Sequence, residues 1–381
     1  MPVGEVPYDA LVTLLVFMVG VPAVVLQTLP PEIRRVTTKR WARLLADLAA
    51  PAIFALAVSL AGVLAPRLSV QIERLTWSGV LGVLVLTALY TAFRILGRYG
   101  RRIAIVRSLE REVGARIRTN GRLREEPLAD LVDLGRQSQP GREKEMVLEA
   151  LRALTGRVMA RPGYAGDGLE DLALGVLDIV IPLPLLRNAQ NFSSAAAIFQ
   201  DIVLRYEGPA SAGGASPLKH ADLISALRAL SKLGRASISL ENDAVPLQIV
   251  QAISAARTPR AAIFVSQALF EVGMAALESE QILTGMSALE KMMMIIEARK
   301  PARGELVADA LGLIAHFYAQ GETGRAFAQA RLDRLEGCLE QDMQTALSAA
   351  AAHCAQTTQF RTADRVRELQ RALQDSAGAA E

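Results

Sequence analysis

The sequence predicts an all-α protein with three N-terminal transmembrane helices followed by a cytosolic stack of helical hairpins, an α-solenoid. Long apolar runs cover about residues 9–29, 44–65 and 76–97, each close to the ~20 residues that a helix needs to cross a bilayer. From Arg101 onward, apolar residues recur at intervals of three and four, which is the period of one helix face. The roughly 280 residues after the third run are expected to contain no further span.

The first run is predicted to remain in the protein as a membrane helix. No Lys or Arg precedes it, whereas a cleaved signal peptide needs a basic start and a small-residue cleavage site. Pro22 and Pro51 are expected to kink the first two helices, because proline removes a backbone donor. Asp47 lies about one turn inside the second run, and it is expected at the interface because a lone charge is costly at mid-membrane depth.

Basic residues define the predicted orientation. Arg34, Arg35 and Arg40 lie between the first two runs, and Arg98, Arg101 and Arg102 follow the third. Short basic loops stay in the cytoplasm, so the N-terminus is expected outside and the C-terminal domain inside. The same arginines are expected to contact anionic lipid headgroups. Aromatic residues that favour the headgroup layer lie at predicted helix ends: Tyr8, Trp41, Trp77 and Tyr99.

Small residues inside the runs favour close helix packing. Ser78 and Gly82 are four residues apart, as are Ala55 and Ser59, and such pairs let two helix backbones approach. They make a homo-oligomer one expectation. The membrane itself is predicted to be a bacterial inner membrane, because only six of the 42 basic residues are lysines and Ala, Gly and Leu are abundant, as in GC-rich bacterial genomes.

The segment after the spans is rich in arginine, with nine between Arg98 and Arg124. Residues 101–125 are predicted to form a basic juxtamembrane helix or linker. Nucleic-acid binding is not expected there, because single-stranded nucleic acids also need aromatic stacking partners, which this segment lacks. Residues 126–375 are predicted to form the helical-repeat domain, and 376–381 a disordered tail.

Helix-breaking residues divide the repeat domain into pairs of helices. They lie at 139–141, 161–168, 208–217, Pro259, Pro301 and Gly321, and Pro182 and Pro184 interrupt a further apolar run. Predicted units begin near Leu218, Ala261, Arg303 and Met343, about 40 residues apart, a period typical of helical-hairpin arrays. Two earlier units are predicted at about 128–159 and 172–206. One hairpin cannot bury its apolar face alone, so each is expected to stack on its neighbours.

Two of these units resemble tetratricopeptide repeats. Phe317, Gly321 and Ala326 have that family's spacing of aromatic, turn glycine and small residue, and Ala195 and Phe199 have the spacing of its second-helix pair. The resemblance covers about 70 of the 381 residues, and Ala330 stands where the repeat has a bulky aromatic residue. It implies a concave surface that binds a peptide, a helix or another protein.

Motifs for catalysis, cofactors or metals are not found. The glycine-rich segment 208–217 follows a predicted helix and lacks the lysine of a phosphate-binding loop, so it is predicted to be a connector. The cysteines and histidines are not spaced as paired zinc ligands; they are Cys338, Cys354, His220, His316 and His353. The acidic residues Glu143, Glu145 and Glu149 are expected on a solvated helix face. Methionines 292–294 are expected to fill the core or to line an adaptable binding groove.

These observations predict a membrane scaffold that is not an enzyme and needs no cofactor. Its cytosolic helical domain is expected to bind a cytosolic or membrane partner protein, and its spans to contact lipid. The alternative is an oligomeric channel or pore-forming effector gated by the helical domain; Thr87 and Thr91, on one helix face, and the small-residue pairs favour it. An enzyme whose site is completed by a partner is a third interpretation.

Overall fold

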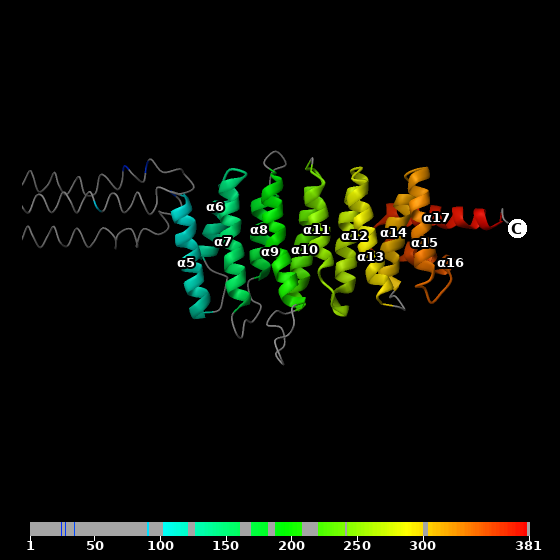
Figure 1. Cartoon of the computed structure of the whole chain (residues 1–381), viewed down its shortest axis with the longest axis horizontal. Helices are drawn as coiled ribbons and strands as arrows, with labels where there is room; N and C mark the ends of the chain where they lie inside the picture. Colours follow the sequence, from blue (N-terminus) through cyan, green and yellow to red (C-terminus); the bar gives the residue numbers. More distant parts are fainter. Residues whose placement is uncertain are drawn as a thin grey trace, which may run out of the picture. The chain divides into compact units, whose positions relative to one another are not determined.

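The computed structural model describes residues 102–120, 126–160, 169–181, 187–207, 220–240, 242–299 and 304–378, together with Val24, Gln27, Arg34 and Tyr90. Within these residues every regular element is a helix, 13 of them α-helices, and no strand occurs (Figure 1). The predicted all-α class is confirmed. By compactness the chain divides into two units, Met1–Arg111 and Glu112–Glu381, and most of the described residues belong to the second.

The three predicted spans lie almost wholly outside the described residues. Val24, Gln27 and Tyr90 are the exceptions, and all three are helical and exposed. Arg34, predicted between two spans, is also helical, and its guanidinium donates to the carbonyl of Gln27 at 2.6 Å. The other predicted membrane residues lie outside the described residues: Tyr8, Arg35, Arg40, Trp41, Ala55, Ser59, Trp77, Ser78, Gly82, Arg98, Tyr99 and Arg101.

One helical stretch among the described residues is long and apolar enough to cross a membrane, although no further span was expected. It is Pro259–Glu278, 20 residues with a mean hydropathy of 1.4 over its most apolar part. Of that part, 61% is buried within the helical domain. The stretch contacts four neighbouring helices, so its length and composition are equally those of a core helix.

The helices have the following bounds: α5 Arg102–Asn120, α6 Glu126–Gln137, α7 Arg142–Met159, α8 Leu169–Val180, α9 Ala189–Glu207, α10 His220–Ser237, α11 Ala244–Ser254, α12 Ala262–Glu278, α13 Ile282–Glu297, α14 Gly304–Tyr318, α15 Glu322–Glu336, α16 Met343–Gln356 and α17 Phe360–Gly378. A 3-10 turn, η3 Pro259–Ala261, precedes α12. Helices α10, α12, α14 and α16 begin 42, 42 and 39 residues apart, each within two residues of a predicted unit start.

Local sequence explains where several helices begin. The Asp342 carboxylate accepts from the Thr345 backbone at 2.9 Å and caps α16, and the Asn188 side chain accepts from Gln190 N at the start of α9. Gly141 and Gly321 precede α7 and α15 with φ of 95° and 91°, a left-handed turn that glycine adopts without strain. At the other end of the chain α17 continues to Gly378, into the predicted disordered tail.

The helices pack in two layers. Helices α6, α8, α10, α12, α14 and α16 each contact the next in that series, and we call this series the even layer. Helices α7, α9, α11, α13 and α15 do the same and form the odd layer. Contacts between the layers join helices that are consecutive in the chain, and Figure 1 shows them following one another in chain order.

Helix α17 departs from this alternation. It packs on α14 and α16, and Figure 1 shows it running across the axes of the other helices. Thr362 of α17 lies against α14 at Gly312 and His316. As a result, residues 306–315 of α14 are all buried, although the preceding even helices expose one side. Helix α17 therefore covers the even layer at its C-terminal end.

Polar side chains connect some of the neighbouring hairpins. Asn191 exchanges hydrogen bonds with the backbone of Gly141, and the Lys144 amine donates to the carbonyl of Ile179 at 2.8 Å, near the C-terminus of α8. Burial lowers the pKa of Lys144. Gln281 donates to the carbonyl of Ile238 at 3.0 Å. These pairs are 35 to 50 residues apart, about one repeat, so the period of the sequence is also the period of its tertiary contacts.

Glycines set how closely helices in one layer approach. A Cβ added at Gly234 of α10 would lie 2.5 Å from Val272 of α12, whereas one at Gly156 of α7 would meet nothing within 4 Å. The even layer is therefore closely packed where α10 crosses α12.

We predict opposite effects for the two alanine substitutions. Gly234→Ala should lower the free energy of unfolding by about 1–3 kcal/mol, because overpacking forces α10 and α12 apart. Gly156→Ala should raise it by about 0.5–1 kcal/mol, because alanine has the higher helix propensity. Chemical denaturation of the full chain, followed by helical circular dichroism, measures both. Equal effects of the two changes would contradict the packing described.

Candidate partner-binding groove

The exposed side of α10 carries a row of basic residues. Arg228, Lys232 and Arg235 are four and three residues apart, which places them on one helix face. All three are exposed, and none has an ion pair with another described residue. The opposite side of α10 packs on α9 and α11. The row therefore points away from the odd layer.

These residues form one wall of a groove between α10 and α12. The groove has a volume of about 250 Å³. Its apolar lining comes from Ile224 and Leu227 of α10 and Ala268 and Phe264 of α12. Its one acidic residue, Glu271, accepts a hydrogen bond from the Ser231 hydroxyl. Three bases face one acid, so the groove carries a net positive charge.

Phe264, in the groove lining, belongs to a small group of aromatic rings. The His220 ring lies 5.7 Å from the Phe264 ring in an edge-on arrangement, and its Nδ1 is 3.4 Å from the Tyr206 hydroxyl. His220 and Phe264 lie at the N-terminal ends of α10 and α12, so these two helices run parallel. The groove thus extends from Phe264 toward Arg235, near the C-terminus of α10.

Acidic residues flank the basic row on the neighbouring helices. Helix α8 exposes Glu170 and Asp178, and α12 exposes Glu278 beyond Glu271. Asp178 lies 3.8 Å from Arg136 of α6. Because α8, α10 and α12 lie in one layer whose other side is covered, these charges share one face. The basic region on this face is therefore only one helix wide.

A buried polar row lies beneath the C-terminal part of the even layer. Ser266 of α12 donates to the Asp309 carboxylate of α14 at 3.1 Å, and His316 of α14 lies 3.3 Å from Thr362 of α17. Burial raises the pKa of Asp309 to about 7, helped by the charges of Glu305 and Glu271 and opposed by the Ser266 hydrogen bond. Burial, together with nearby arginines, lowers the pKa of His316 to about 4.

These two groups should make stability depend on pH in opposite directions. Folded Asp309 keeps its proton up to about pH 7, whereas an ordinary Asp loses its proton near pH 3.8. The stability that Asp309 contributes to the folded state is therefore lost as the pH rises between these two values. Unfolded histidine takes up a proton near pH 6.5 and His316 only near pH 4, so its contribution is lost as pH falls. In the native protein the two largely cancel between pH 4 and 6.5.

We predict that single variants reveal each contribution. As the pH rises from 4 to 6.5, the free energy of unfolding of Asp309→Asn should increase by roughly 2–3 kcal/mol relative to that of the native protein. The free energy of unfolding of His316→Gln should decrease by a similar amount, relative to that of the native protein, over the same rise in pH. Denaturant titrations of the full chain at pH 4.5, 5.5 and 6.5 measure the differences. A pH-independent difference for both variants would show that neither group titrates as described.

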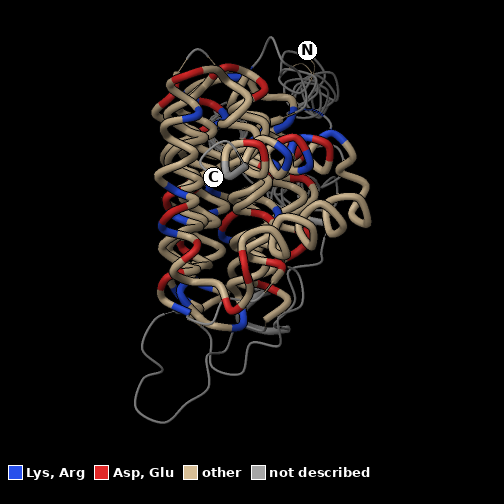
Figure 2. Tube along the Cα trace, turned by 90° about the vertical axis from the view of Figure 1, so that its right-hand side faces the viewer, with Lys and Arg blue, Asp and Glu red and all other residues tan. Residues whose placement is uncertain are grey.

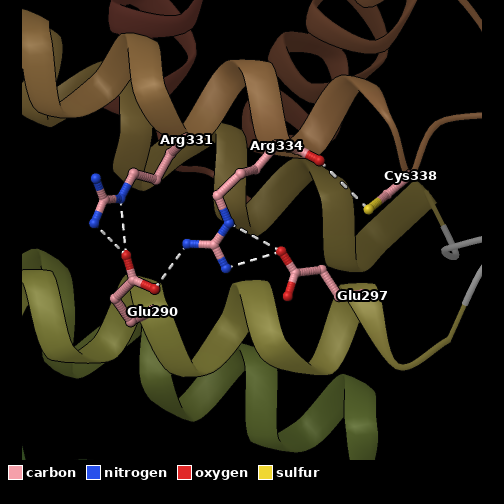
Figure 3. A network of polar contacts seen from close by, with 5 residues as sticks. All are labelled: Glu290, Glu297, Arg331, Arg334 and Cys338. Atoms are coloured by element: carbon pink, nitrogen blue, oxygen red, sulfur yellow. Dashed lines mark hydrogen bonds and ion pairs between the residues drawn. The ribbon is translucent and has the colours of Figure 1, made fainter.

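Ion pairs join α13 and α15 at the C-terminal end of the odd layer, and we call this group of ion pairs the clamp (Figure 3). Arg331 and Arg334 of α15 both bind the Glu290 carboxylate of α13, and Arg334 also reaches Glu297 at 2.8 Å. The Arg331 guanidinium lies 3.8 Å from the centre of the Phe327 ring. Burial would raise the pKa of Glu290, but hydrogen bonds from Arg334 and Arg331 outweigh it and lower the pKa.

The clamp is expected to hold α15 in place, because that helix buries only Ala328, Leu332 and Leu335. Glu290→Gln should reduce the protection of α15 amides from hydrogen exchange by about 1 kcal/mol, since partial solvent exposure weakens the ion pairs. The control Glu336→Gln alters an exposed acid of α15 that makes no ion pair with another described residue. Equal protection of the α15 amides in the two variants would show that the ion pairs of Glu290 do not hold α15 in place.

The residues matched to tetratricopeptide repeats have different environments. Ala195, Phe199 and Phe317 are buried, and Gly321 makes the turn before α15. Ala326 is exposed on α15, however, and the fully buried alanine of that turn is Ala328. The small residue at 326 therefore does not make the helix contact that the resemblance implies, because α15 turns its other face toward the core.

The remaining predicted residues lie apart from the groove. Met292 and Met293 are buried in the core and Met294 is exposed. Cys338 and Cys354 are buried free thiols, and burial raises the pKa of Cys354 to about 11, which leaves it a poor nucleophile. No group of three or more metal-ligating side chains occurs among the described residues. Arg102, expected at the lipid surface, is the first residue of α5.

No protein-family model, curated protein or solved structure matches the chain. The groove was missed by sequence reasoning, although the spacing of Arg228, Lys232 and Arg235 was visible in the sequence. That spacing alone does not show that the three bases lack partners or that Phe264, 36 residues later than Arg228, faces them.

Proposed function

We propose that the chain is an integral membrane scaffold. Three N-terminal spans would anchor an α-solenoid at the inner face of a bacterial cytoplasmic membrane, with the N-terminus outside. The exposed side of the even layer would dock a partner protein. The observation that carries this proposal is the α10–α12 groove, which combines an aromatic ring, an apolar lining and three bases without ion pairs among the described residues.

The contact pattern supports a solenoid. Each helix from α7 to α14 contacts the helices before and after it in the chain and the next helix of its own layer. Such nearest-neighbour packing is the property that defines helical-repeat arrays, which bind partners along an extended face. The tetratricopeptide-like spacing in two units agrees with this architecture, and the exposed Ala326 shows where that likeness ends.

The membrane anchor is supported by the three apolar runs and by two described residues within them. Val24 and Tyr90 are 59% and 64% exposed. Large apolar side chains that are exposed in a helix of this composition suit a hydrocarbon environment better than water. The basic residues after the third run would then hold α5 at the cytoplasmic surface.

A binding role agrees with where the perturbed ionisable groups lie. Among the described residues, the large pKa shifts are those of Asp309, His316 and Cys354, and all three lie among the packed helices α12, α14, α16 and α17 rather than in the groove. Groups that titrate abnormally in a catalytic site usually line a cleft. Here they are better explained by burial within the layer.

Two leucines of equal exposure test which layer docks the partner. Leu174 of α8 lies in the even layer and Leu204 of α9 in the odd layer, and each is 49% exposed. We predict that a photo-crosslinking amino acid at position 174 gives a discrete protein adduct in the cells that make the protein, and that one at 204 does not. Leu174→Glu should abolish capture of that adduct's partner by the full chain, and Leu204→Glu should not.

The same preparations separate the proposal from the pore alternative. Adducts of equal yield at 174 and 204, or at neither, would contradict docking on the even layer. A ring-shaped oligomer that conducts ions in liposomes, with loss of flux on a bulky change at Ser78 or Gly82, would favour the channel. A monomer without ion flux would leave the scaffold as the better account.

A further inference from the structure

We infer that the α10–α12 groove binds an extended acidic segment of the partner, with carboxylates at alternate positions. This inference rests on the proposed docking function and names the chemistry of the docked segment. It comes from the unpaired basic row on α10 and from the shape of the groove beside it.

The spacing of the bases suits an extended chain. Along α10, Arg228 and Lys232 are separated by a rise of ~6 Å, and Lys232 and Arg235 by ~4.5 Å. In an extended strand, side chains on one face recur every ~6.6–6.8 Å. An Asp or Glu at every second residue can therefore approach successive bases with small side-chain adjustments. A small single anion would engage only one or two of them.

The other wall of the groove fits the remaining side chains of such a segment. Phe264 and Ala268 of α12 present apolar surface opposite the basic row. In an extended chain, side chains alternate between two faces, so residues between the carboxylates would face this apolar wall. Gln267, exposed on α12, adds an amide that can pair with the backbone of the segment.

The flanking charges limit the size of the anion. The basic row is one helix wide, with Glu170 and Asp178 exposed on α8, and with Glu278 exposed and Glu271 half-buried on α12. A nucleic acid or an anionic membrane would extend its phosphates over these carboxylates, and like charges at close range disfavour binding. A short acidic segment lies within the row and avoids them.

The experiment uses the full chain in nanodiscs of neutral phosphatidylcholine and measures fluorescence anisotropy. The probe is a fluorescein-labelled ten-residue peptide of alternating Glu and Thr, because β-branched threonine favours the extended form. We expect binding that weakens as salt rises. The triple variant R228Q/K232Q/R235Q should weaken it roughly tenfold to a hundredfold, since three ion pairs are lost.

A matched triple variant controls for total charge. R142Q/R205Q/R371Q removes three exposed arginines that make no ion pair with another described residue and lie on α7, α9 and α17. We expect it to change the affinity less than twofold. An equal loss in both triple variants would show that net charge, not the groove, attracts the peptide, and would overturn the inference.

Two further probes separate the alternatives. A labelled peptide of alternating Lys and Thr should not bind, and binding of it would contradict charge recognition. A ten-nucleotide single-stranded RNA should bind more weakly than the acidic peptide. Tighter binding of the RNA, lost in R228Q/K232Q/R235Q, would identify the groove as a nucleic-acid site and overturn the inference.

The outcome is distinguishable from failure of the scaffold proposal. If the adduct at position 174 persists in R228Q/K232Q/R235Q and the acidic peptide does not bind the native chain, the partner docks on the even layer without an acidic segment, and this inference alone is wrong. If the peptide binds through the basic row but no adduct forms at position 174, the groove binds an acidic segment as inferred, and the docking proposal is wrong.

Discussion

The structure depends on the inability of one helical hairpin to bury its own apolar face. Each helix from α6 to α14 therefore packs against its partner in the hairpin and against the next helix of its layer. Close approach at Gly234 against Val272 and hydrogen bonds such as Asn191 to Gly141 act at these contacts. The spacing of about 40 residues between the starts of α10, α12, α14 and α16 is thus also the spacing between helices that contact one another.

An array of this kind leaves one exposed side on each layer, and the two sides differ chemically. At the C-terminal end of the odd layer, Arg331 and Arg334 are bound by Glu290 and Glu297, so these bases are already satisfied. In the even layer the bases of α10 have no such partners among the described residues. Figure 2, which colours charged residues along the trace, shows both signs distributed over the helices rather than collected in one block. What distinguishes α10 is therefore its unpaired charge rather than a high charge density.

Helix pairs and their starts were predictable because breakers and apolar periodicity are local properties. Gly321 before α15 and Met343 after the Asp342 cap show this directly. The placement of α17 was not predictable, because its contact with α14 through Thr362 depends on tertiary packing 46 residues away in sequence. Ala326 shows the same limit, since motif spacing does not reveal which side of α15 faces the core. For the groove, the row of bases on α10 can be found in the sequence. The sequence does not show that these bases lack ion-pair partners among the described residues, or that the ring of Phe264 lies opposite them.

The position of α17 explains why the groove lies between α10 and α12. From α14 onward, α17 covers the even layer, and Arg361 of α17 approaches Glu278 at the end of α12 to 3.6 Å. On the C-terminal side of the groove, the outer surface of α14 is therefore covered by the chain itself. On the N-terminal side, α8 presents acids and an exposed leucine instead of bases. In the α10–α12 groove an uncovered apolar lining lies beside bases that have no ion pair with another described residue, which is why we infer that an extended acidic segment, rather than another helix, is its occupant.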